Sequence, residues 1–202
     1  MSFGYRLDQV FTVGHSTHPI ERFIGLLERF AVTCVCDVRS SPYSRRNPHF
    51  NREALRDSLN RHAISYTFLG AELGGRTKDD SCYVDGKVQY AILAATPSFR
   101  EGLQLVLEES RVSTVALMCA EKEPLDCHRT ILVARHLSDL GVEIEHILAT
   151  GESERHQDTI NRLVDLLKLD RADLFLTERE VVDRAYRLRA EEIAYQDTKR
   201  AS

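Results

Sequence analysis

The segment CAEKEPLDCHR concentrates side chains that could perform chemistry. Cys127 directly precedes His128 and Arg129 at the expected start of a helix, where the helix dipole attracts anions and lowers the pKa of a thiol. A thiolate at this position is a nucleophile or a metal ligand. Cys119 competes for the same role, and Glu121 is a candidate general acid or base. We assign Arg129 to substrate binding and the other four residues to catalysis.

Two further segments, GHSTHP and GAELGGR, place polar residues at turns. The pKa of histidine lies near physiological pH, so His15 is a candidate acid, base or ligand, and we count it among the catalytic residues. Ser16 either caps the following helix or contacts the substrate. The glycines of GAELGGR allow the backbone to approach a ligand, and Glu72 and Arg76 are candidates to line a pocket. The segment matches neither a Walker loop nor a dinucleotide fingerprint.

The segment DVRSSPYSRRNPHF is locally basic. The planar fork of arginine suits phosphate and carboxylate groups, so we assign Asp37 and Arg39 to substrate binding. The alternative is a solvated loop in which these two residues pair with each other. We make no assignment for Arg45 and Arg46.

A metal and a phosphatase loop are the two alternatives for the cysteine segment. A tyrosine-phosphatase loop needs an arginine six positions after its cysteine, and Leu125 stands there after Cys119. Zinc accepts the ligand types of Cys119, Cys127, His128 and His15, but the paired spacing of a zinc finger is absent. We therefore expect a site without a metal and keep zinc as an alternative.

These residues must be positioned by strands and helices that alternate along the chain. The patterns predict strands over 10–13, 33–38, 65–69, 112–118 and 143–148, and helices over 20–30, 52–61, 99–110 and 130–140. Asp126 is the expected N-cap of the helix over 130–140, and Gly141 is its expected C-cap. A longer excursion over 70–86 has the turn signals of a lid. After Gly151 the pattern is helical only, and Thr177 and Glu180 form a capping box.

We therefore predict an α/β fold: a mainly parallel, five-stranded, Rossmann-like sheet flanked by helices. Residues 1–150 form the α/β domain that carries the site, and residues 151–202 form a helical C-terminal extension packed on it. The four polar segments each follow a strand. Because the carboxyl ends of parallel strands share one edge of a sheet, residues far apart in sequence should line one pocket there.

Composition narrows the class of protein. The 202 residues suit one domain, and 27 Lys and Arg against 31 Asp and Glu give a formal charge of −4, which argues against a surface that binds nucleic acid or membranes as a whole. No apolar run is long enough to span a membrane, and the first residues lack the pattern of a signal peptide. Five cysteines without regular spacing are expected to be reduced. We infer a cytoplasmic protein.

The four segments, in this order, resemble the bacterial and archaeal family called domain of unknown function 488. The resemblance rests on VGHSTHP, DVRSSPYSRRNPHF, LGAELGG and CAEKEPLDCHR, and extends to DLF and AYRLRAEEIAYQ near the C-terminus. Cys34 and Cys36 stand where the family more often has aliphatic residues. The resemblance implies an α/β fold with a shared pocket, and it implies no reaction.

Three functional hypotheses follow. In the first, the protein is an enzyme, a transferase or hydrolase, that binds a phosphate-bearing substrate such as a nucleotide or nucleic-acid end. Its anion would lie between Arg39, Arg129 and the helix start, with a cysteine nucleophile and His15, Glu121 or His128 moving protons. The second is a non-catalytic nucleic-acid or effector-binding module. The third is a Cys/His metal protein. The sequence identifies neither a cofactor nor an oligomeric state.

Overall fold

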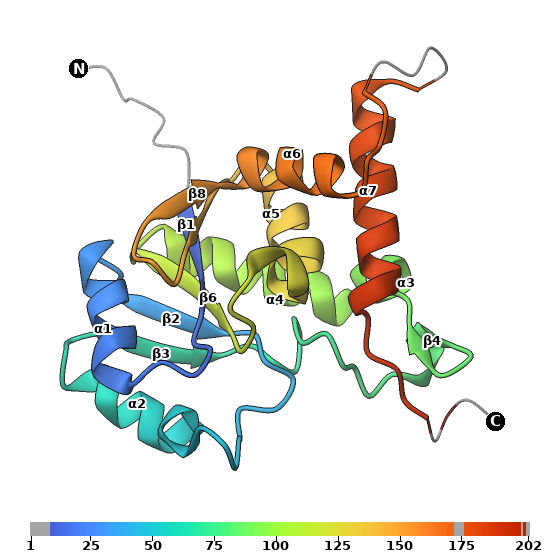
Figure 1. Ribbon diagram of the computed structural model, residues 1–202. Coiled ribbons are helices and arrows are strands. Elements are labelled where there is room, and N and C mark those ends of the chain that lie inside the picture. Colours follow the sequence, from blue (N-terminus) through green and yellow to red (C-terminus); the bar gives the residue numbers. More distant parts are fainter. Residues whose placement is uncertain (1–8, 172–175, 199, 201–202) are drawn as a thin grey trace.

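The computed structural model describes residues 9–171, 176–198 and 200, and it has a mixed α/β fold with helices on both faces of a mostly parallel sheet (Figure 1). Residues 1–8 and 173–175, on which the signal-peptide argument and part of the family resemblance rest, lie outside the described residues. No helix in the described ranges has the length and apolar character needed to cross a bilayer.

The main sheet consists of β1 (Gln9–Gly14), β2 (Cys34–Asp37), β3 (Ser65–Phe68), β6 (Val115–Cys119), β7 (Glu143–Ile147) and β8 (Ser153–Arg155). A short hairpin is made by β4 (Tyr83–Val84) and β5 (Lys87–Val88). The α-helices are α1 (Ile20–Arg29), α2 (Arg52–Asn60), α3 (Tyr90–Ala94), α4 (Pro97–Ser110), α5 (Arg135–Asp139), α6 (His156–Leu166) and α7 (Glu178–Ile193). Three 3-10 turns (Pro48–Phe50, Asp80–Cys82, Pro124–Asp126) and a π-helical segment (Arg129–Ala134) complete the described elements.

The strand order is β3-β2-β6-β1-β7-β8, with β8 antiparallel to β7 and the other pairs parallel. In the Rossmann order the first strand lies beside the second, whereas here β6 separates β1 from β2. The connection after β2 runs toward the β3 edge and the one after β6 runs toward the β7 edge. The ends of β2 and β6 therefore flank a crevice of the kind in which open α/β sheets bind ligands.

The two faces of the sheet carry separate cores. Apolar residues of α1 and α2 pack on one face, among them Phe23, Leu27 and Leu55. Residues of α3, α4, α5, α6 and α7 pack on the other, as Figure 1 shows. Right-handed crossovers account for this division, because connections that run in opposite directions along a parallel sheet leave on opposite faces. The central strands are buried on both sides and so read as nearly continuous apolar runs.

The structure corrects several local expectations. The strand expected over 112–118 is β6, which begins at Val115. Val112 lies in the turn before it and is 82% exposed. The segment after Gly151 is not helical only, because residues 153–155 form β8. The 130–140 helix opens as a π-helical segment, and Asp126 does not cap it; Glu123 caps the 3-10 turn before it. The capping box of Thr177 and Glu180 is confirmed.

A buried chain of hydrogen bonds crosses the second core. The hydroxyl of Thr12 lies 2.7 Å from His146 Nδ1, His146 Nε2 lies 2.9 Å from His156 Nδ1, and His156 Nε2 lies 2.8 Å from the hydroxyl of Tyr186. Burial lowers the pKa of His156 to about 4 and holds that of His146 well below its usual value. Both imidazoles are therefore neutral in the folded protein at neutral pH. The chain ties β1 and β7 to α6 and α7.

Acidification should destabilise the fold through these histidines. Below pH 6.5 these histidines become protonated in the unfolded chain but stay neutral in the folded chain. Their contribution to the free energy of unfolding is therefore fully present above pH 6.5 and is lost as the pH falls toward 4. His156 alone should account for about 3 kcal/mol of the free energy of unfolding. Urea unfolding between pH 7 and pH 4 measures this loss. His156→Gln should flatten the profile and His62→Gln, on the surface, should not; equal profiles would contradict the assignment.

Candidate active site

Three loops, the start of α3 and the end of α7 enclose a pocket at the carboxyl edge of the sheet. The cavity has a volume of about 430 Å³, which suits a small molecule. Its walls come from the loop after β2 (Arg39, Ser40, Ser41, Tyr43), the loop after β3 (Gly75, Arg76), α3 (Tyr90), the segment after β6 (Cys119, Ala120, Glu121, Asp126, His128) and the end of α7 (Ile193, Tyr195). The expected convergence of distant residues therefore occurs.

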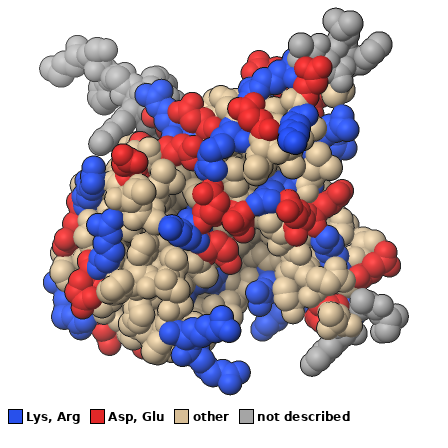
Figure 2. Space-filling model, in the orientation of Figure 1, with Lys and Arg blue, Asp and Glu red and all other residues tan. Residues whose placement is uncertain are grey.

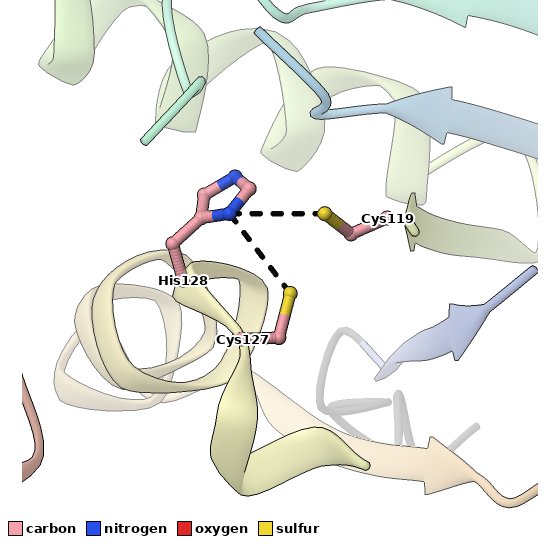
Figure 3. A group of neighbouring side chains, drawn as sticks. All are labelled: Cys119, Cys127 and His128. Carbon is pink, nitrogen blue, oxygen red and sulfur yellow. Dashed lines mark hydrogen bonds between the residues drawn. The ribbon is translucent and has the colours of Figure 1, made fainter. Parts of the chain in front are cut away.

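One wall of the pocket is formed by a cluster that we call the thiol cluster: Cys119, Cys127, His128 and Glu121. Glu121 Oε2 lies 2.9 Å from Cys119 Sγ and 3.1 Å from Cys127 Sγ, so this carboxylate accepts a hydrogen bond from either thiol when that thiol is protonated. His128 Nδ1 lies 3.7 Å from Cys119 Sγ and 3.9 Å from Cys127 Sγ (Figure 3). Cys119, Glu121 and His128 line the cavity, whereas Cys127 lies behind them.

The two thiols differ in their electrostatics. Burial raises the pKa of the Cys119 thiol, and the neighbouring Cys127 and Glu121 raise it further. Burial would also raise the pKa of Cys127, but the hydrogen bond with Cys119 and the charge of Arg129 outweigh it and lower that pKa. The backbone N–H of Arg129 points at Cys127 Sγ over 3.5 Å. Cys127 is thus the thiol that the protein favours as a thiolate, and Cys119 is the one that faces the pocket.

The ring of His128 is held in one orientation. Its Nε2 donates to the carbonyl of Val38 over 2.9 Å, so Nδ1 carries the lone pair that faces the sulfurs when the imidazole is neutral. Gly75 makes room for this ring, because a β-carbon at that position would lie 2.9 Å from His128 Cγ. Gly75, in the loop after β3, therefore contributes to the site because its missing side chain leaves space for the imidazole.

A buried ion pair forms the floor beside the thiol cluster. Arg39 binds Asp37 through two parallel contacts, Nε to Oδ1 at 2.9 Å and Nη2 to Oδ2 at 2.6 Å, and the hydroxyl of Tyr66 donates to Oδ2 at 2.7 Å. Arg39 Nη1 lies 3.2 Å from Nε2 of His15. Burial and the charge of Arg39 lower the pKa of His15 to about 4, so His15 is a neutral acceptor. Asp37 and His15 therefore hold the arginine that reaches the pocket.

Arg129 does not face the pocket, although the sequence suggested a substrate-binding role. Its side chain is fully buried, and its Nη1 donates to the carbonyl of Glu121 over 2.6 Å. Nη2 donates to the carbonyl of Lys122 over 3.4 Å. A β-carbon at Gly14 would lie 1.9 Å from that same Glu121 oxygen, so only glycine fits there. Arg129 thus positions the segment that carries Glu121.

Ser16 and Glu72 also lie outside the cavity wall. Ser16 has a left-handed backbone (φ 49°), and its N–H donates to the carbonyl of Ala120. It does not cap α1, because the N-cap position of that helix is Pro19 and no side chain caps it. Glu72 packs beside Gly102 of α4. Arg76, in contrast, does line the pocket, where its guanidinium lies 4.5 Å from the centre of the Tyr195 ring.

Sequence reasoning missed the contribution of aromatic residues to the pocket. Tyr90 begins α3, and Tyr195 follows α7. Neither stands in a polar motif, and the signal that could have indicated Tyr195 was its place in the C-terminal part of the family resemblance. The helical extension thus supplies one wall of the pocket.

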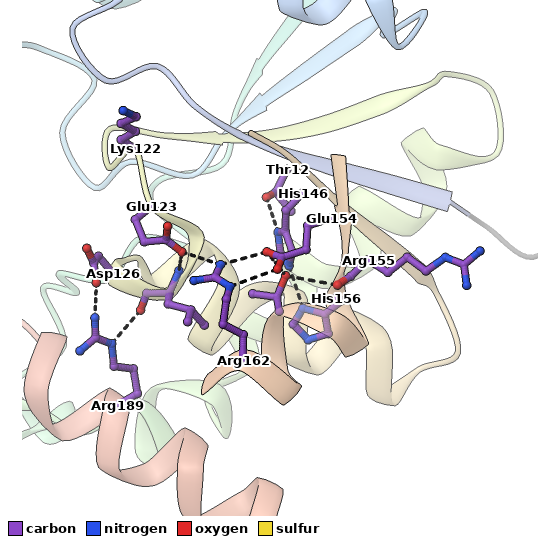
Figure 4. A network of polar contacts seen from close by, with 12 residues as sticks. Thr12, Lys122, Glu123, Asp126, His146, Glu154, Arg155, His156, Arg162 and Arg189 are labelled. Carbon is purple, nitrogen blue, oxygen red and sulfur yellow. Dashed lines mark hydrogen bonds and ion pairs between the residues drawn. The ribbon is translucent and has the colours of Figure 1, made fainter. Parts of the chain in front are cut away.

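The last two helices also hold the segment between Glu121 and Cys127 (Figure 4). Arg162 of α6 binds Glu123 at 2.8 Å and Glu154 at 2.9 Å. Arg189 of α7 donates its Nε to the carbonyl of Leu125 over 3.0 Å and pairs with Asp126. Asp126, which the sequence predicted to be an N-cap, therefore binds α7 through Arg189.

Residues 19–136 match the model of a family described as Domain of unknown function DUF488. The matched range contains the segments that follow β2, β3 and β6, and it ends before β7. No curated protein and no solved structure matches the chain.

Removing the charge of Asp37 should destabilise the protein strongly. Asp37→Asn leaves the buried guanidinium of Arg39 without its counter-ion, which costs about 3–5 kcal/mol of the free energy of unfolding. The matched control is Asp57→Asn in the exposed pair with Arg56, where the change should stay within about 0.5 kcal/mol. Urea unfolding compares the two variants. Similar effects on both would show that the Asp37–Arg39 pair does not hold the pocket floor.

Proposed function

Since the chain belongs to the family described as Domain of unknown function DUF488, and that description names no activity, we propose a function from the pocket: the protein is an enzyme, a hydrolase or transferase, that acts on a small anionic substrate. One observation carries this proposal. Two thiols, an imidazole and a carboxylate meet within hydrogen-bond or van der Waals distance, and three of these four groups face a cavity of small-molecule size.

The residues take distinct roles in this proposal. The thiol cluster supplies the attacking group, and Glu121 transfers protons, because its exposed carboxylate contacts both sulfurs and faces the cavity. Arg76 attracts the anion, since it is exposed at the cavity wall, and Arg39 lines the cavity from another loop with its charge largely balanced by Asp37. Ser40, Tyr43 and Tyr90 offer hydroxyl groups to orient it. Asp37, His15 and Arg129 are positioning residues.

The proposal that the substrate is anionic rests on the positions of the charged side chains around the cavity. Figure 2 shows a hollow on this face of the molecule with basic side chains along its lower rim and acidic ones above it. Phosphate is the natural probe, because arginine forks and hydroxyl groups bind its oxygens well. A nucleotide or a nucleic-acid end presents this group together with a base that can stack on an aromatic ring.

A nucleic-acid-binding module without catalysis is the second candidate, and the loop after β2 favours it. Tyr43 is 56% exposed on that loop, and Arg45 and Arg46 beside it are also exposed. An exposed ring next to two cations can stack on a base and neutralise phosphates. Binding of this kind would weaken steeply with salt and would not depend on Cys119.

Thermal unfolding in the presence of phosphate, nucleotides, sugar phosphates and short oligonucleotides tests the proposal. A ligand at ~100 times its dissociation constant adds about 2.7 kcal/mol, which raises Tm by several degrees for a domain of this size. Arg76→Gln should reduce the shift, and Arg111→Gln, at the far end of α4, should leave it intact.

Turnover of the ligand found in this way separates the two candidates. Cys119→Ser should abolish turnover and leave the thermal shift intact, because the thiol reacts while other residues bind. A ligand that binds but is never converted, with an unchanged shift in Cys119→Ser, would favour the binding module. The absence of a shift with every probe would contradict an anionic substrate.

A further inference from the structure

The second thiol of the cluster has no role in a single-nucleophile mechanism. Cys127 is 1% exposed and does not line the cavity, so a substrate cannot reach it, and yet it lies against the same carboxylate and the same imidazole as Cys119. A catalytic thiol needs one base, whereas here two thiols share a carboxylate and an imidazole. The function of the cluster must therefore involve both sulfurs, Cys119 Sγ and Cys127 Sγ.

The distances within the group are those of a tetrahedral metal site. The two sulfurs and His128 Nδ1 all lie within 4.8 Å of one another. Zinc lies about 2.3 Å from sulfur and about 2.0–2.1 Å from nitrogen, so a tetrahedral angle separates S and N by ~3.6 Å. The observed separations from Nδ1 are 3.7 Å and 3.9 Å. Small side-chain adjustments would thus close the three groups around one ion.

The hydrogen bonds around Cys127 and His128 resemble those that surround metal-binding side chains in other proteins. Histidines that bind metals donate their other ring nitrogen to a carbonyl or carboxylate, as His128 Nε2 does to Val38. The backbone N–H of Arg129 points at Cys127 Sγ, and such contacts stabilise a thiolate. A disulfide between Cys119 and Cys127 would use neither the imidazole lone pair nor this N–H.

We propose that Cys119, Cys127 and His128 bind one zinc ion, with its fourth position open to the cavity. Two thiolates and an imidazole are ligands that zinc prefers, and three protein ligands with one open position are typical of catalytic sites. Binding displaces two protons, one from each thiol, and the charges of Zn²⁺ and the two thiolates cancel. Glu121 Oε2 is placed to accept these protons in turn and pass them to solvent.

This inference rests on the proposed function only for its chemical consequence. If the pocket is an active site, a zinc ion held by Cys119, Cys127 and His128 would activate water in place of a free thiol, and Glu121 would be the general base beside it. Zinc deaminases use the same set of parts, with Cys and His ligands and a glutamate that is not a ligand. The ligand set itself stands on the geometry of the three side chains.

Metal content and cobalt absorption test the site without an assay of turnover. Protein purified under reducing conditions should contain one zinc per chain by elemental analysis. After removal of zinc by a chelator, Co²⁺ should produce the visible bands of a tetrahedral ion and a sulfur-to-cobalt charge-transfer band. Zinc should also protect two thiols from a thiol reagent, in step with its occupancy.

Matched variants assign the ligands. Cys119→Ser, Cys127→Ser and His128→Gln should each lower zinc affinity by on the order of 100-fold or more, since loss of an outer contact alone costs 10–100-fold. Cys82→Ser removes a buried thiol outside the cluster and should retain full zinc content. Circular dichroism of each variant and of the metal-free wild type separates loss of a ligand from loss of the fold.

Two results would overturn the proposal. One is zinc content that is negligible in the reduced wild type, together with no cobalt spectrum. The other is a Cys119–Cys127 disulfide, found by mass spectrometry in protein that takes up no metal even after reduction. Neither result depends on the ligand panel, so a failure of the zinc site and a failure of the anionic-substrate proposal are distinguishable.

Discussion

The buried guanidinium of Arg129 is the contact on which the arrangement of the site depends. It belongs to the π-helical segment that follows the thiol cluster, and it donates back to the carbonyl groups of Glu121 and Lys122. The segment that leaves β6 is thereby folded onto the helix that follows it, and Cys119 and Cys127 meet. A fully buried cation is costly unless its donors are satisfied, and here both Nη groups donate to this segment while Nε has no partner among the described residues. The segment therefore has little freedom to move away from Arg129.

Two arginines that the sequence marked as anion ligands are used in different ways. Arg129 is enclosed by backbone carbonyl groups, whereas Arg39 is balanced by Asp37 and supported by the neutral ring of His15. Arg129 lowers the pKa of the Cys127 thiol and, being buried, cannot contact a ligand. Arg39 lies at the cavity wall with its charge largely balanced by Asp37. The exposed cation of the pocket is Arg76, from the loop after β3.

The C-terminal helices are part of the site as well as of the core. Arg162 and Arg189 bind the segment between Glu121 and Cys127 from outside, and Tyr195 lines the cavity from within. The chain of Thr12, His146, His156 and Tyr186 fixes α7 to the sheet through buried hydrogen bonds. A displacement of α7 would therefore change both the cavity wall and the support of the thiol cluster.

The sequence alone determined the α/β class, the five parallel strands, and the convergence of their loops, because apolar periodicity is local and parallel strands share one carboxyl edge. It also placed the capping box at Thr177 and located the CAEKEPLDCHR segment at the end of a strand. Only the tertiary structure decided the place of β6 between β1 and β2, the addition of β8, and the burial of Arg129. It alone selected Arg76 over Glu72 for the cavity and brought His128 between two sulfurs. These features depend on which surfaces pack together, and a short non-local strand or a buried arginine leaves no periodic signal in the chain.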